Sequence, residues 1–265
     1  MIEAWLAALA GLLIGSFLNV CIYRLPRDLS VVTPRSFCPE CDRPIAWYDN
    51  IPVLSYILLR ARCRRCGVRI PLRYPLVEVL TAAAFFAAVL ILGLNGLAIK
   101  YCVFSTIIIA LVFSDFEERI LPDEFTIGGT IVGLVLAAMA PTDGGIWRFI
   151  LMSVRNPRVL SVIDAAVAAA FSSFALWAVG ALYEKLRHRE GLGFGDVKMV
   201  AMIGAFLGLQ GVLMTLVVGS VLGSVVGIGF IIFARKDAST YELPFGTFLG
   251  IAAFGVAYYS ILMGH

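Results

Sequence analysis

Long runs of apolar residues dominate the chain, and short polar segments separate them. A run of roughly 20 residues with few charges is typical of a helix that crosses a membrane. The pattern therefore predicts an all-α polytopic membrane protein with about eight transmembrane helices. The predicted spans lie near 4–23, 75–95, 98–114, 125–140, 161–182, 197–209, 211–233 and 245–263.

Composition agrees with this fold class. Hydrophobic residues make up 60% of the chain, charged residues only 15%, and the mean hydropathy is +0.93. These values exclude an ordinary soluble domain. The first apolar run has no basic residue before it, and positive charge arrives only afterwards at Arg24 and Arg27. We therefore expect this run to remain as a membrane anchor and not to be removed as a signal peptide.

Charge is concentrated between the first two spans. Residues 25–73 contain nine Arg against four acidic residues. By the positive-inside rule this loop is predicted to be cytoplasmic, which places both chain ends on the opposite side after eight spans. Loop 141–160, with three Arg on the predicted outer side, is expected to include an interfacial helix. Arg-rich loops are usual in membrane proteins, so we expect lipid and no nucleic acid as a partner.

Four of the six cysteines form two C-x-x-C pairs inside this loop, Cys38-Pro-Glu-Cys41 and Cys63-Arg-Arg-Cys66. Two such pairs are typical of a zinc-ribbon or rubredoxin-like site, in which four sulfurs surround one ion. A reducing cytosol keeps the thiols free for a metal, and zinc is favoured over iron or empty thiols. The sequence therefore predicts a small zinc-ribbon-like domain that the metal holds together.

Two aspartates are predicted to lie at the same membrane edge. Asp115 ends the third apolar run, and Asp196 follows Gly193 and Gly195 at the start of the sixth. A lone aspartate at a membrane boundary is more often a solvated terminus or a helix cap than a functional group. Two on one side favour a shared site, and the glycines allow a sharp turn and close approach of a substrate strand.

Two close carboxylates that share one proton can hydrolyse a peptide bond without a metal or a covalent nucleophile. Asp196 is predicted to open a helix, where the dipole stabilises negative charge, whereas Asp115 is predicted to close one. We therefore hypothesise that Asp196 starts as the base and Asp115 as the acid. Leu121-Pro122-Asp123 is expected to cap the next helix. Lys198 either reaches lipid headgroups or tunes the pair, and both interpretations remain open.

An ordered series of motifs also runs along nearly the whole chain. It resembles the type IV prepilin peptidases, and its Gly-x-Gly-Asp feature is shared more distantly with presenilin-type intramembrane proteases. The resemblance implies an aspartic endopeptidase of the bacterial inner membrane that cleaves the basic leader of type IV prepilins and type II secretion pseudopilins. The motifs are Gly15-Ser-Phe-Leu-Asn19, Arg24-Leu-Pro26, the two Cys pairs, Asn50-Ile-Pro-Val-Leu-Ser-Tyr56, Arg73-Tyr-Pro-Leu-Val-Glu78, Asp115 with Leu121-Pro-Asp123, Gly193-Phe-Gly-Asp196 and Pro244-Phe-Gly246.

The resemblance also implies methylation of the new amino terminus with S-adenosylmethionine. It puts the catalytic aspartates on Asp115 and Asp196. We expect Gly193, Gly195, Asp123 and Lys198 to support the protease loop around them. It puts the zinc ligands on Cys38, Cys41, Cys63 and Cys66. Candidates for binding the methyl donor are Gly15, Asn19, Arg24 and Glu78, although glycine and asparagine inside spans are also typical packing residues.

Methyl transfer rests on the resemblance alone. The chain has no Gly-rich nucleotide-binding fingerprint, and Ala61-Arg62 stand where many relatives have glycine and a basic residue. The expected division is a first transmembrane helix at 1–24, a cytoplasmic four-cysteine domain at 25–73 that forms the methyltransferase region with adjacent helices, and a membrane domain with the protease site at 74–265. One alternative is a peptidase without methyltransferase activity. Another is a proton-coupled transporter or membrane redox carrier, whose cysteines hold iron.

Overall fold

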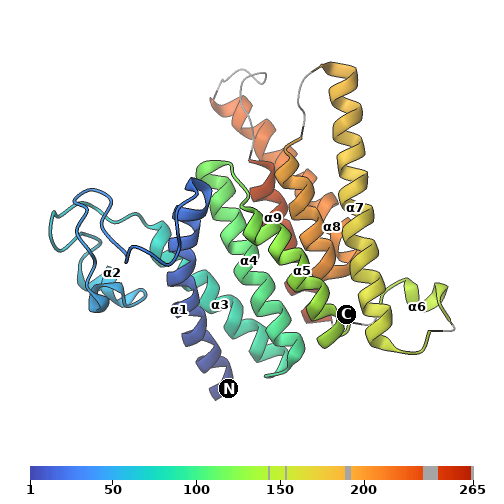
Figure 1. Ribbon diagram of the computed structural model, residues 1–265, viewed down its shortest axis with the longest axis horizontal. Coiled ribbons are helices and arrows are strands. Elements are labelled where there is room, and N and C mark those ends of the chain that lie inside the picture. The colour runs from blue at the N-terminus through green and yellow to red at the C-terminus, as the bar shows by residue number, and fades with distance from the viewer. Residues whose placement is uncertain (143, 153, 189–191, 235–243, 264–265) are drawn as a thin grey trace. The chain divides into compact units, whose positions relative to one another are not determined.

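The structure is a computed structural model of residues 1–265, and it describes all of them except 143, 153, 189–191, 235–243 and 264–265. Helices and connecting segments make up the described part, which has no strand beyond two isolated bridges (Figure 1). The all-α prediction is therefore confirmed. The long helices are α1 (Ile2–Arg24), α3 (Arg73–Leu92), α4 (Gly96–Glu118), α5 (Asp123–Met139), α7 (Pro157–Arg187), α8 (Phe194–Ala234) and α9 (Phe245–Met263), and the short ones include α2 (Leu54–Leu58) and α6 (Trp147–Ile150).

Helix length and composition support a polytopic membrane protein. Within the described residues, six helices are long and apolar enough to cross a membrane, namely α1, α3, α4, α7, α8 and α9. The count of eight is not confirmed by this measure. The difference arises at α5, which has 17 residues, and at α8, which was expected as two separate spans.

Gly208 divides α8 into the helical segments 194–207 and 209–234. Its φ of 70° and ψ of −176° interrupt the helix. The two segments run in opposite directions, because α9 lies alongside the first in parallel order and alongside the second in reverse order. The neighbouring pairs are Gly246 with Asp196, Gly250 with Met199, Phe248 with Gly223, and Leu249 with Gly219. The break falls where the sequence predicts the boundary between two apolar runs.

The chain forms two compact units, Met1–Ala110 and Leu111–His265. In the first unit, α1 packs against α3. Gly11 and Gly15 allow this contact, because a Cβ atom on either would lie 2.7 Å from a backbone Cα atom of α3. Small residues spaced by four are typical of such close crossings. The predicted domain boundaries at 25–73 and 74–265 stay a prediction.

In the second unit, α8 packs against α5, α7 and α9. The first segment of α8 is well buried, since Met199, Met202 and Ile203 have no exposed surface. Asp164 of α7 is also buried, and it accepts a hydrogen bond from the backbone N–H of Leu209 at 3.2 Å. This contact satisfies a donor at the start of the second segment, which helix geometry leaves without a partner. Loop 141–160 contains the four-residue helix α6, whose position at a membrane interface stays a prediction.

Candidate active site and metal cluster

The two aspartates singled out by the sequence lie close together in the second unit. Asp115 is near the end of α4, and Asp196 is in the first turn of α8. Their oxygens Oδ2 and Oδ1 lie 3.1 and 3.2 Å from the position that a Cβ atom on Gly246 would take. These two oxygens are therefore separated by no more than the sum of those distances. Asp115 is buried and Asp196 is partly exposed. The pair is therefore accessible from the side of Asp196.

The start of α9 holds the carboxylate of Asp115. Its Oδ2 accepts hydrogen bonds from the Thr247 backbone N–H at 2.6 Å and from the Thr247 hydroxyl at 2.8 Å. Thr247 is in the first turn of α9, where backbone N–H groups and the helix dipole stabilise negative charge. Sequence reasoning did not assign Gly246 or Thr247 to the site. Their signal was the Pro-Phe-Gly triplet at the start of the last apolar run.

Gly193 and Gly195 shape the approach to Asp196. The carbonyl of Gly193 accepts a hydrogen bond from the Asp196 N–H at 3.1 Å, and a Cβ atom on Gly195 would lie 3.3 Å from the side chain of Leu121. Neither glycine has a positive φ. The expected sharp turn therefore does not depend on left-handed backbone at these residues. The missing side chains allow close contacts instead. Gly193 lies next to the Asp196 carboxylate, and Gly195 lies next to Leu121.

Asp123 and Lys198 form an ion pair beside this turn. The Lys198 ammonium lies 2.6 Å from Asp123 Oδ1 and 5.1 Å from the centre of the Phe194 ring. Asp123 is the first residue of α5, whose N-cap is Pro122, and no side chain caps that end. The carboxylate thus joins α5 to α8 and does not cap its own helix. A partly exposed pair of this kind contributes little to stability.

The four cysteines of the loop converge as a metal site requires. The sulfurs of Cys38, Cys41, Cys63 and Cys66 all lie within 4.8 Å of one another, and the Cys38 and Cys66 sulfurs are 3.8 Å apart. Tetrahedral zinc with bonds of about 2.3 Å places its sulfur ligands roughly 3.8 Å apart. Hydrogen bonds from the backbone N–H groups of Cys66 and Arg65 lower the pKa of the Cys63 thiol to about 7. Burial raises the pKa of Cys38, and despite the Val68 N–H, burial and the neighbouring thiols raise the pKa of Cys66 to about 11, so the fit to a metal rests on the sulfur distances. The donor set therefore fits a structural zinc ion.

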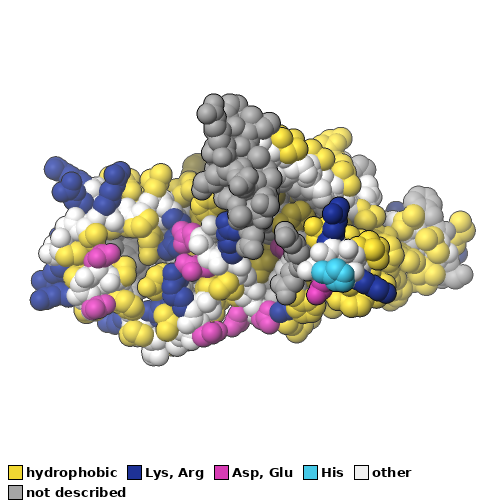
Figure 2. All heavy atoms as spheres, turned by 90° about the horizontal axis from the view of Figure 1, so that it is seen from above, with side chains coloured by type: hydrophobic (Ala, Val, Ile, Leu, Met, Phe, Trp, Pro, Cys, Tyr) yellow, Lys and Arg dark blue, Asp and Glu magenta, His cyan; other side chains and the backbone are white. Residues whose placement is uncertain are grey.

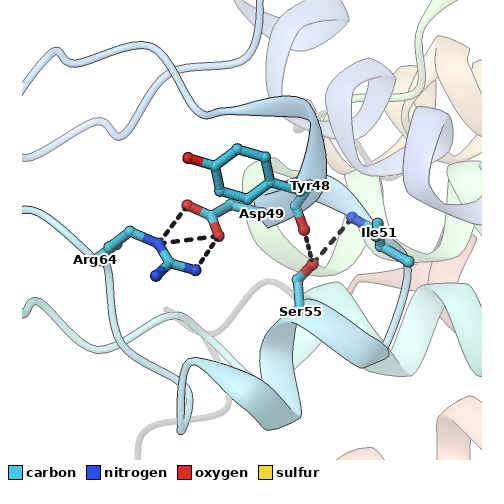
Figure 3. Close-up of polar contacts among 5 residues, drawn as sticks. All are labelled: Tyr48, Asp49, Ile51, Ser55 and Arg64. Atoms are coloured by element: carbon cyan, nitrogen blue, oxygen red, sulfur yellow. Dashed lines mark hydrogen bonds and ion pairs between the residues drawn. The ribbon is translucent and has the colours of Figure 1, made fainter.

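The second Cys pair is fastened to the segment that precedes α2. Figure 3 shows the Arg64 guanidinium in a two-pronged contact with the Asp49 carboxylate, at 2.6 Å from Nη2 to Oδ1 and 2.9 Å from Nε to Oδ2. In the same view, the Ser55 hydroxyl donates to the Tyr48 carbonyl at 2.9 Å and accepts from the Ile51 N–H at 3.0 Å. Arg64 thereby joins the second Cys pair to Asp49, and Ser55 holds the segment 48–55 together.

Gly15 and Asn19, two candidates for binding the methyl donor, lie at the crossing of α1 and α3. Asn19 is buried, and its Nδ2 donates to the Gly15 carbonyl at 3.2 Å and to the Tyr74 carbonyl at 3.0 Å. A Cβ atom on Gly15 would lie 2.7 Å from the Cα atom of Glu78. Both residues therefore serve helix packing.

Arg24 and Glu78, the other two candidates, hold the loop. The Arg24 guanidinium donates to the carbonyls of Ser30 and Pro34, both at 2.8 Å. Glu78 Oε2 accepts from the Val53 backbone N–H at 2.7 Å. Each buried charged residue thus anchors one stretch of the loop to a membrane helix.

The loop also carries the exposed positive charge of the first unit. Its exposed arginines appear as a dark blue group in the left part of Figure 2. This distribution agrees with the Arg excess from which the sequence predicts a cytoplasmic loop. The exposed residues are Arg27, Arg35, Arg43, Arg60, Arg62, Arg64, Arg65 and Arg69.

Two family models match the chain. The model of the bacterial peptidase A24 N-terminal domain matches residues 9–92, which include the Cys cluster. The model of the type IV leader peptidase family matches residues 102–228, which include both aspartates of the pair. No solved structure matches the chain.

Curated relatives are similar over most of the sequence. A prepilin leader peptidase/N-methyltransferase of Myxococcus xanthus (strain DK1622) is 43% identical over 82% of the chain, which spans 60% of that relative's length. Proteins with the same name from Aeromonas hydrophila and Neisseria gonorrhoeae are each 34% identical. The matches cover 93% and 84% of the chain and 87% and 80% of those relatives.

Proposed function

The chain belongs to the type IV leader peptidase family, and from that premise we propose that it is a membrane-embedded aspartic endopeptidase that cleaves prepilin leaders. The observation that carries the proposal is the meeting of Asp115 and Asp196 at Gly246. We further propose that type II secretion pseudopilins are substrates. We also propose that membrane lipid is a partner and that nucleic acid is not. The Arg excess of loop 25–73 supports a site at the cytoplasmic face of the inner membrane and two periplasmic termini.

Cleavage follows from two carboxylates that share one proton. The ionised carboxylate removes a proton from water, and the water oxygen attacks the peptide carbonyl carbon. The protonated carboxylate gives its proton to the carbonyl oxygen. When the tetrahedral intermediate collapses, the carbon–nitrogen bond breaks and the departing amine takes the proton that the first carboxylate removed from water, while a hydroxyl of the intermediate returns its proton to the second carboxylate.

We assign the resting negative charge to Asp115 and the shared proton to Asp196. Two donors from Thr247 and the N-terminus of α9 stabilise an ionised Asp115. This assignment reverses the roles expected from the sequence. That expectation considered only the helix on which each aspartate lies, and it did not include α9.

We propose a second activity in the first unit, methylation of the amino terminus that cleavage exposes, because the relatives are named as N-methyltransferases. S-adenosylmethionine would supply the methyl group, as its carbon–sulfur bond breaks and a carbon–nitrogen bond forms with loss of a proton from the amine. Gly15, Asn19, Arg24 and Glu78 act as the frame of the donor site. A zinc ion on the four cysteines would hold the loop folded.

The proposal is tested by leader cleavage with purified wild type, Asp115→Asn and Asp196→Asn. Each variant is expected to lose roughly 10²–10⁴-fold in rate, because each removes one acid–base group. Thermal midpoints in detergent check that the variants fold. Near-normal cleavage by either folded variant would remove that aspartate from the mechanism. Transfer of a labelled methyl group to the cleaved product separates the bifunctional enzyme from a peptidase alone.

A further inference from the structure

A cavity of about 350 Å³ lies in the first unit, between α1 and the loop segments 31–36 and 50–52. Its volume is within the range of about 300–1,000 Å³ that is typical of small-molecule sites. The aspartate pair and the Cys cluster contribute no residue to its lining. The cavity is therefore separate from both sites described above.

The lining combines an apolar wall with polar groups. Leu13, Phe17 and Val20 of α1 form the apolar wall, and Val31 and Val32 face it from the loop side. Such a wall suits a flat heterocycle, since ligand sites are mostly apolar and contain a few polar groups that fix orientation.

Three polar residues of the lining are available to a ligand. Within the part of the chain that the structure describes, the side chains of Arg35, Ser36 and Asn50 make no hydrogen bond or ion pair. Arg24 differs, because its guanidinium already donates to loop carbonyls. Ser16 also lines the cavity, but its hydroxyl is hydrogen-bonded to the Glu78 carboxylate. The groups left for a ligand are thus one guanidinium, one hydroxyl and one amide.

We propose that this cavity binds the methyl donor, S-adenosylmethionine. The inference rests on the proposed methyltransferase function and gives that function a location. The donor contains an adenine ring for the apolar wall, a carboxylate for Arg35, and ribose hydroxyls for Asn50 and Ser36. A phospholipid would satisfy Arg35 through its phosphate, but it has no group that requires the amide of Asn50.

The buried frame explains how the cavity keeps its shape. Arg24 binds the carbonyl of Ser30, just before the 31–36 wall, and the carbonyl of Pro34 within it. Glu78 binds the N–H of Val53, next to the 50–52 wall, and the Arg64–Asp49 contact fixes the same stretch from the metal side. Arg24 and Glu78 are therefore positioning residues, and the polar contacts with the donor come from the loop, whereas the apolar contacts come from α1 and the loop.

The test uses the full chain in detergent and S-adenosylhomocysteine, the unreactive product of the donor, with calorimetric measurement of binding. Arg35→Gln and Asn50→Leu are each expected to weaken binding by about tenfold or more, because each removes a polar contact. Arg43→Gln is the matched control, since Arg43 is an exposed arginine of the same loop and does not line the cavity. It is expected to change binding by less than about twofold. Zinc content and thermal midpoint verify that all variants fold.

The possible outcomes distinguish failure of the proposed binding site from failure of the proposed methyltransferase function. If wild type binds and both cavity variants bind equally well, the location is wrong, although methyl transfer still stands. If wild type cleaves leaders but neither binds this ligand nor methylates the product, the proposed methyltransferase function fails. If Val32→Trp displaces a copurified phospholipid and leaves ligand binding unchanged, the cavity is a lipid site and the inference is overturned.

Discussion

Gly246 lies between the two carboxylates with no space for a side chain. A Cβ atom there would lie 3.0 Å from the carboxyl carbon of Asp115 and 3.2 Å from Oδ1 of Asp196. Gly246→Ala is therefore expected to displace the pair. Leader cleavage should fall by about tenfold, because the carboxylates must move by a few tenths of an ångström and a misplacement of about 1 Å can cost about a hundredfold in rate. Initial rates on a prepilin substrate measure the effect.

Gly255 gives a control on the same helix, because nothing lies within 4 Å of a Cβ atom built there. Gly255→Ala should cleave at nearly the wild-type rate and melt at the wild-type temperature. Equal rates for the two alanine variants would show that the space beside Gly246 is not where the reaction takes place.

The residues of the pair were predictable from the sequence, but their immediate surroundings were not. Asp115 and Asp196 stand out because both are predicted to lie at the same membrane edge, and Asp196 follows a Gly-x-Gly turn. Thr247 does not stand out, because its main contribution is a backbone N–H, 132 positions along the chain from Asp115. Every residue except proline has such a group, so only the fold reveals which one faces the carboxylate.

The reversal within α8 depends on one glycine and one buried acid. Gly208 has a φ of 70°, and a Cβ atom there would collide with the Asp164 carboxylate that binds the Leu209 N–H. Gly208→Ala should lower the free energy of unfolding by about 1–3 kcal/mol, from left-handed backbone strain and displacement of the cap. Thermal unfolding in detergent should show a midpoint several degrees lower.

Gly229 is the matched control in the second segment of α8, where a Cβ atom meets nothing within 4 Å. Gly229→Ala should melt as wild type does or slightly higher, since alanine favours a helix. A Gly208→Ala variant as stable as this control would contradict the role given to the reversal.

Apolar length predicted the helices well where the apolar run and the helix end together. The predicted span at 125–140 corresponds to α5 (Asp123–Met139). The prediction at 161–182 stopped short, because α7 continues to Arg187. Basic residues in its last turn are favourable for the helix dipole, so the helix extends beyond its apolar part. Hydropathy alone does not predict this polar extension of the helix.

At the scale of the whole molecule, the two units carry different parts of the proposed chemistry. The Cys cluster and the donor cavity belong to Met1–Ala110, whereas both aspartates belong to Leu111–His265. Cys63→Ser should therefore abolish zinc binding, expose the loop to proteolysis and remove binding of S-adenosylhomocysteine. Leader cleavage should fall much less than methyl transfer. Metal analysis, limited proteolysis and the two activity assays on one preparation measure these effects.

Cys102→Ala separates loss of the metal from loss of a cysteine. Cys102 packs against the cluster of Ala4, Val89 and Ala98 and is not one of the four converging thiols, so this variant should keep one zinc ion per chain and both activities. Parallel loss of cleavage and methyl transfer in Cys63→Ser would mean that the loop also positions the leader for the aspartates. That result would make the metal a condition for both reactions, because a substrate bound through the loop could not reach the pair once the loop unfolds.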